Sequence, residues 1–173
     1  MRPIHLIGML TLFVAGPAAA MTLTSADIAP GAAIPARQVY ARCGGSNQSP
    51  QLSWRGAPPG TRSFAVTMID LDVKPAQWSH WIVVDLPATV TSLPTGARSL
   101  PAPGRALASD FGDAAYGGPC PPRGSGVHHY QITVWALPTP RADLPPGGAA
   151  AVVSGRLSKA AIDHASLTGT VRG

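Results

Sequence analysis

Apolar and polar residues alternate along several short segments of the chain. These segments cover residues 21–28, 51–54, 62–69, 80–86 and 128–137. Alternation over such short lengths is typical of half-buried β-strands. Long proline-rich connections, for example residues 94–104 and 117–126, separate the segments. The pattern predicts one mostly-β domain, a sandwich of antiparallel sheets.

A single segment near the end of the chain favours a helix instead. Residues 157–167, LSKAAIDHASL, combine helix-forming residues with a spaced apolar pattern, and Ser154 or Ser158 is the expected N-cap. The rest of the composition disfavours helices, because the chain has 19 glycines, 19 prolines and no glutamate. We therefore expect one short C-terminal helix beside the sheets.

The first 20 residues have the pattern of a cleavable signal peptide. Arg2 precedes an apolar stretch that ends in Ala18-Ala19-Ala20. The alternative is a membrane anchor, but the apolar stretch is shorter than the roughly 20 residues that span a bilayer. We predict cleavage after Ala20, a single domain over residues 21–173, and a periplasmic or secreted location.

Charge and cysteine content narrow the class of protein further. The formal net charge is +5, but the basic residues are scattered, so no nucleic-acid-binding surface is indicated. The two cysteines, Cys43 and Cys120, form an even number in a chain expected to enter an oxidising compartment. This favours a disulfide; the alternative is two separate buried thiols.

Strand alternation places a polar residue at one end of three apolar rows. Asp70 ends the first row, whereas His80 and His128 lie near the starts of theirs. The rows are Phe64, Val66, Met68 and Asp70; Trp78, His80, Ile82 and Val84; and His128, Tyr130, Ile132 and Val134.

These polar ends meet if the strands are arranged in one particular way. An antiparallel connection between residues 70 and 80 brings Asp70 and His80 to the same edge. If the strand of His128 runs parallel to that of His80, His128 and Tyr130 join them there. Imidazole and phenol donors suit a small anion such as phosphate or carboxylate. His129 points to the opposite face.

Other site chemistries fit the sequence less well. Asp70, His80 and His128 match no metal-binding spacing. Ser79 and His80 point to opposite faces, and no G-x-S-x-G motif occurs, which argues against a serine hydrolase. A nucleophilic Cys120 competes with the disulfide. No cofactor and no metal are expected.

Four segments resemble the phosphatidylethanolamine-binding protein family, specifically its bacterial Raf-kinase-inhibitor-like branch. They occur in the family's order and cover most of residues 21–173. The segments are CGGSNQSPQLSW at 43–54, PPGTRSFAVTMIDLD at 58–72, WSHWIVVDLPA at 78–88 and DFGDAAYGGPCPPRGSGVHHYQITVWAL at 110–137. The resemblance implies an antiparallel β-sandwich with an anion-binding pocket at one end.

The family motifs, carried over by position, imply a ligand-binding set. The D-P-D-x-P motif falls on residues 70–75, the tryptophan-flanked histidine is His80, and G-x-H-R-Y and GGPCPP fall on 126–130 and 117–122. The implied ligand-binding residues are Asp70, Asp72, His80, Gly118, Pro119, His128 and Tyr130.

The chain departs from these motifs at several positions. Leu71 replaces the first motif proline, Lys74 precedes Pro75, and His129 stands where the family has arginine. These changes are expected to reshape the pocket rim and to make any contact of His129 pH-dependent. Residues 161–171 also look like a shortened form of the family's C-terminal helix.

The sequence favours a non-enzymatic binding protein for a small anion, phosphorylated ligand or phospholipid headgroup. Two alternatives stay open: a hydrolase-like or isomerase-like enzyme using Asp70 and a histidine, and an inhibitory protein-interaction module with an unidentified target. Peripheral membrane contact and a homodimer are compatible with the sequence, whereas nucleic acid is not an expected partner.

Overall fold

The computed structural model describes residues 20–173, and the structural statements below concern this part of the chain. The predicted signal peptide, residues 1–20, lies almost wholly outside it. Among the described residues, no helix has the length and apolar character needed to cross a membrane.

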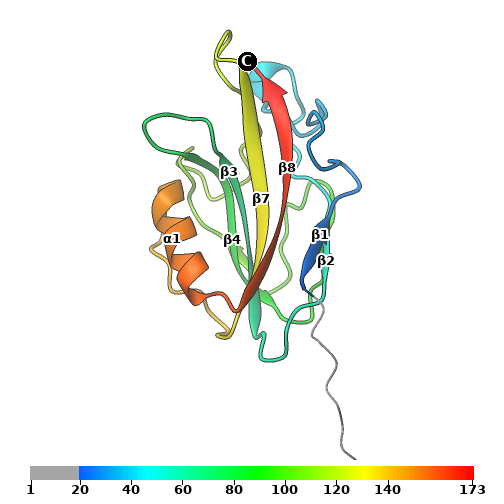
Figure 1. Ribbon diagram of the computed structural model, residues 1–173, viewed down its shortest axis with the longest axis vertical. Coiled ribbons are helices and arrows are strands. Elements are labelled where there is room, and N and C mark those ends of the chain that lie inside the picture. Colours follow the sequence, from blue (N-terminus) through cyan, green and yellow to red (C-terminus); the bar gives the residue numbers. More distant parts are fainter. Residues whose placement is uncertain (1–19) are drawn as a thin grey trace, which may run out of the picture.

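The described strands form two antiparallel sheets (Figure 1). The smaller has the order β1-β2-β5, with bounds Thr22–Thr24, Leu52–Arg55 and Ser92–Leu93. The larger has the order β6-β4-β3-β7-β8, with bounds Arg105–Ala106, Trp78–Pro87, Ser63–Asp70, Val127–Leu137 and Asp163–Arg172. A 3₁₀ turn, η1, covers Ala41–Cys43, and α1 covers Ala150–Ala160. The mostly-β sandwich prediction is confirmed.

The centre of the larger sheet is buried on both faces, because α1 covers one side and the smaller sheet covers the other (Figure 1). Between the sheets lie Phe64, Val66 and Met68 of β3, which is the row that alternation predicts. On the opposite face, Ala65 of β3 packs in a second cluster with Leu157 of α1. The central strand β3 therefore has all eight residues buried, as expected of a strand with a packed layer on each side.

The helix prediction is correct in kind and wrong in its bounds. Instead of covering residues 157–167, α1 begins at Ala150 and ends at Ala160, and Ser154 and Ser158 lie inside it. Residues 163–172 form β8, which pairs with β7 along nearly its whole length. The segment at 161–171 is thus mainly an edge strand rather than a shortened helix.

Candidate functional site

Three strands of the larger sheet deliver polar side chains to one edge. β3 is antiparallel to both β4 and β7, so β4 and β7 run parallel to each other on either side of it. Asp70, the last residue of β3, pairs with Trp78 at the start of β4 and with Tyr130 near the start of β7. The strand arrangement that the sequence prediction required is confirmed.

The row predicted for β4 is wrong beyond its first two members. Met68 pairs with Trp81 and Ile69 with Ser79, so His80 is an extra residue in a β-bulge. The bulge leaves His80 and Trp81 on the same face, where Trp81 joins the inter-sheet core. Ile82, predicted to share a face with His80, packs toward α1 instead.

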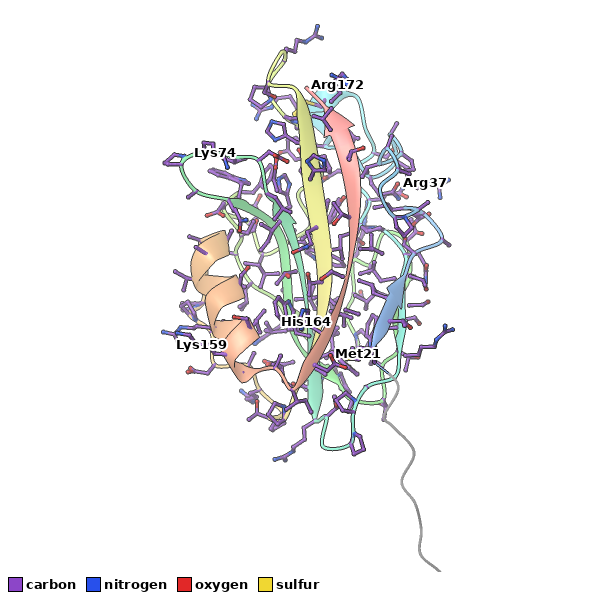
Figure 2. All side chains as sticks on the ribbon, viewed as in Figure 1. Met21, Arg37, Lys74, Lys159, His164 and Arg172 are labelled. Atoms are coloured by element: carbon purple, nitrogen blue, oxygen red, sulfur yellow. A yellow bond between two sulfur atoms is a disulfide. The ribbon has the colours of Figure 1, made fainter. Side chains whose placement is uncertain are left out.

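A cavity of about 210 Å³ opens at this edge. Apolar walls surround a small polar set, which is the usual character of a small-molecule site. The lining residues are Asp70, Val73, Trp78, His80, Phe111, Cys120, Pro121, Pro122, His128 and Tyr130. The labelled residues Lys74 and Arg172 mark this end of the molecule, whereas His164 lies toward the other end (Figure 2).

Asp70 and His128 form a buried hydrogen-bonded pair in the cavity wall. His128 Nδ1 donates to Asp70 Oδ2 over 2.7 Å, and both side chains are less than a tenth exposed. Asp70 Oδ1 also accepts the backbone N–H of Asp72, at 2.9 Å. The Nε2 atom of His128 lies 3.0 Å from Ser125 Oγ. With both ring nitrogens engaged, His128 is oriented rigidly, and part of the Asp70 charge is compensated.

His80 is held differently and keeps one nitrogen for a ligand. Its Nδ1 donates to the carbonyl oxygen of Gly117 over 2.7 Å, which makes Nε2 the unprotonated nitrogen of the neutral ring. Burial lowers the pKa of His80 below its ordinary value of 6.5, although the Gly117 carbonyl and the Asp70 charge act in the opposite direction. The imidazole ring of His80 also packs edge-on with the rings of Phe111 and Tyr130, whose centroids lie 5.0 Å and 5.1 Å from its own.

Tyr130 contributes a buried hydroxyl that has no hydrogen-bond partner. The residue is 1% exposed and lines the cavity, and its Oη atom makes no hydrogen bond of good geometry, although the Asp70 carboxylate lies close enough to act on it. Burial raises the pKa of this phenol above its usual range, so the hydroxyl keeps its proton and remains a donor. A buried polar group without a partner is costly, and an oxyanion in the cavity would satisfy it.

The remaining candidate residues, Asp72, Gly118 and Pro119, do not line the cavity. Asp72 instead ties the β3–β4 loop to β7, because its Oδ2 accepts both the backbone N–H and the Nδ1–H of His129, at 2.6 Å and 2.8 Å. The hydrogen bond from the His129 backbone and, to a smaller extent, the one from the His129 side chain lower the pKa of Asp72. Gly118 and Pro119 are buried just behind the wall, which is formed by the next residues, 120–122.

The predicted disulfide is present and lies at the cavity wall. Cys43 and Cys120 are bonded, with Cα atoms 5.7 Å apart. Cys120 lines the cavity, so the bond anchors this wall to η1. Sequence reasoning missed the aromatic wall residue Phe111, because nothing in its local pattern distinguishes it from a loop residue.

Comparison with known proteins places these features in a family. The model of the family described as phosphatidylethanolamine-binding protein matches residues 24–172. The UPF0098 protein YbcL of Escherichia coli K12 is 42% identical over 159 residues, which cover 87% of each chain. A mycobacterial relative, the candidate lipoprotein LppC of Mycobacterium tuberculosis H37Rv, is 35% identical over 153 residues, or 88% of this chain and 73% of LppC.

Solved structures agree with the sequence comparison. The crystal structure of E. coli YbcL, described as a new member of the mammalian PEBP family, superposes with a TM-score of 0.82 at 40% identity and covers 88% of this chain and 98% of YbcL. The phosphatidylethanolamine-binding protein homologue CT736 of Chlamydia trachomatis gives a TM-score of 0.74 at 29% identity, covering 89% and 98%.

Proposed function

The chain belongs to the phosphatidylethanolamine-binding protein family, and on this premise we propose that it is an exported binding protein for a phosphate-type headgroup. The ligand's oxyanion occupies the cavity between His80 and Tyr130. The observation that carries the proposal is the buried Tyr130 hydroxyl, a donor without a partner at the cavity wall. His80 Nε2 is the second contact, and the Asp70–His128 pair orients the wall.

The carboxylate in the wall restricts the ligand further. Asp70 would repel a bare anion, but its charge is partly compensated by His128 and by the Asp72 backbone N–H. A headgroup that combines an anionic oxygen with a proton donor, such as a P–OH group or an ammonium, matches this set of groups. Its oxygen accepts from the Tyr130 hydroxyl, and its proton donor faces the acceptors His80 Nε2 and Asp70. Phosphoethanolamine and related phosphate monoesters have this chemistry.

A tyrosine-to-phenylalanine pair tests the proposal by isothermal titration calorimetry with inorganic phosphate and phosphoethanolamine. Tyr130→Phe removes only the unpartnered hydroxyl, so we expect unchanged or higher thermal stability and an affinity loss of about tenfold or more. Tyr116→Phe is the matched control. It removes a hydroxyl that donates to the Gln38 carbonyl over 3.0 Å, so it should lower stability and leave affinity unchanged. Equal phosphate affinity in Tyr130→Phe and the parent protein would contradict the proposal.

The export part of the proposal rests on the predicted cleavage after Ala20. The Met21 nitrogen lies 3.2 Å from Asp163 Oδ2. Cleavage would turn this amide into an α-ammonium group, which forms a stronger, charge-assisted bond to the same carboxylate. Mass spectrometry of the secreted or periplasmic protein should therefore give Met21 as the first residue. Recovery of only the uncleaved chain from the cytoplasm would refute export.

A further inference from the structure

A second, larger depression adjoins the cavity and is basic. This groove has a volume of about 880 Å³, and three arginines, Arg42, Arg123 and Arg172, line it. No aspartate lines it, and among residues 20–173 the arginines in ion pairs are others: Arg37, Arg105 and Arg156. The groove is therefore a concentration of guanidinium groups without acidic side chains as partners, and the carboxylate of Gly173, which also lines it, offsets part of their charge.

The groove and the cavity share a wall. Cys120 and Pro121 line both depressions, so the two lie on either side of this short segment. Arg172 marks this end of the molecule in Figure 2, near the end of β8. The two depressions are thus neighbours, separated by the segment that contains Cys120 and Pro121.

The backbones of two of the arginines are tethered close to the cavity, whereas all three residues are exposed. The Cys43–Cys120 disulfide joins their backbones, because Arg42 directly precedes Cys43 and Arg123 follows Cys120 within one short loop. The Arg42 guanidinium also lies 6.0 Å from the Tyr40 ring centroid, and Tyr40 packs on the cavity residue Phe111 with centroids 5.4 Å apart. Stacking occupies the face of a guanidinium group and leaves its N–H edge free for an anion.

We propose that the ligand carries at least two anionic groups, one bound in the His80–Tyr130 cavity and another bound by Arg42, Arg123 and Arg172 in the groove. This inference rests on the proposed function, because the first anionic group is the one assigned to the cavity. Guanidinium groups bind phosphate in bidentate geometry, which makes a second phosphate the best-matched group. When one molecule carries both anionic groups, binding of the first group in the cavity holds the second group near the arginines. The second group then binds at a high effective concentration, which raises the affinity of the whole ligand.

Calorimetry with inorganic phosphate, pyrophosphate and tripolyphosphate at constant ionic strength tests the inference. We expect tripolyphosphate to bind at least about tenfold more tightly than phosphate. The triple variant Arg42→Gln, Arg123→Gln, Arg172→Gln should lose that advantage and keep its phosphate affinity within about threefold. The matched control is Arg55→Gln, Arg62→Gln, Arg141→Gln, which removes the same charge from residues that line neither depression. It should retain the advantage.

Four results would overturn the inference. If the longer anions bind no more tightly than phosphate, or if both triple variants weaken them equally, the cavity site stands and the groove has no specific role. If tripolyphosphate binding survives His80→Ala unchanged, the groove binds anions alone and the two-group ligand is wrong. If phosphate itself fails to bind, the proposed function fails, and this inference fails with it.

Discussion

His80 makes anion binding depend on pH in a defined direction. Its Nδ1–H is committed to the Gly117 carbonyl, so Nε2 can donate to an anion only when the ring is protonated. Burial lowers the pKa of His80, so the unliganded ring is neutral at neutral pH. Asp70 and Asp110 are the carboxylates whose charge acts on this ring and favours its protonation.

Sulfate is the probe that isolates this effect, because it carries no proton between about pH 5 and pH 8. Sulfate affinity should rise as the pH falls, since binding then requires proton uptake by His80, and should level off below the folded-state pKa of His80. Above that pKa the loss should approach about tenfold per pH unit. Calorimetry across this range, with His80→Gln as a variant whose amide does not titrate, measures the slope. An equal slope in His80→Gln would refute the role given to His80.

Substitution of the two adjacent histidines, His128 and His129, should affect phosphate affinity to different extents. His128 is buried against Asp70, whereas the His129 side chain is half exposed and bonded to Asp72. His128→Ala should reduce phosphate affinity by about tenfold or more, because it removes part of the cavity wall and leaves the Asp70 charge compensated only by the Asp72 backbone N–H. His129→Ala should change affinity less than about twofold. Titration of both variants, after circular dichroism confirms folding, decides the matter; equal losses would show that strand alternation does not separate their roles.

At the scale of elements, a glycine in the 117–122 loop has no room for a side chain, whereas a glycine in α1 has ample room. A Cβ atom at Gly118 would lie within 3 Å of backbone atoms of Gln38 and Tyr40. Gly118→Ala should therefore lower the free energy of unfolding by about 2 kcal/mol or more. At Gly155, within α1, an added Cβ atom would have no neighbour within 4 Å, so Gly155→Ala should raise it by about 1 kcal/mol. Urea denaturation measures both, and a neutral Gly118→Ala would mean that the loop backbone can shift.

How far the sequence predicts each element depends on how local its determinants are. The rows of β3 and β7 could be predicted because strong apolar residues alternate along both strands. The bulge at His80 could not, because it is visible only in the pairing of β4 with β3. It is also the feature that leaves His80 and Trp81 on one face.

The end of α1 and the start of β8 show the same limit. Residues 157–167 combine several helix-forming residues with a spaced apolar pattern, whereas the inward positions of β8, Ala165, Leu167, Gly169 and Val171, form a weak alternating pattern because two of them are small. The free edge of β7 decides the outcome, since pairing along it satisfies a full ladder of backbone groups. At Gly169, a Cβ atom would meet the side chains of Ile34 and Ile28 within about 3 Å. Tertiary contacts therefore override local helix propensity here.

At the scale of the whole molecule, the site depends on segments that lie far apart in the chain. Asp70 and His128 are 58 residues apart, and His80 and Gly117 are 37 apart. The sheet places the three strand ends, but the 117–122 loop, which supplies the wall residues 120–122, belongs to no strand. The disulfide, with a sequence separation of 77, connects that wall to η1. The bond is thus the main covalent constraint on both the cavity and the adjoining groove.

Reducing this disulfide should lower the free energy of unfolding, and the length of the closed loop determines by how much. Closing a loop of 77 residues restricts the unfolded chain, and the chain-entropy relation gives about 4.5 kcal/mol. Urea denaturation with and without a reducing agent should show this loss in the parent protein. The double variant Cys43→Ser, Cys120→Ser should already show it and should not respond to the reductant. Coincident unfolding curves for the oxidised and reduced parent would mean that the surrounding packing, rather than the bond, holds the wall against η1.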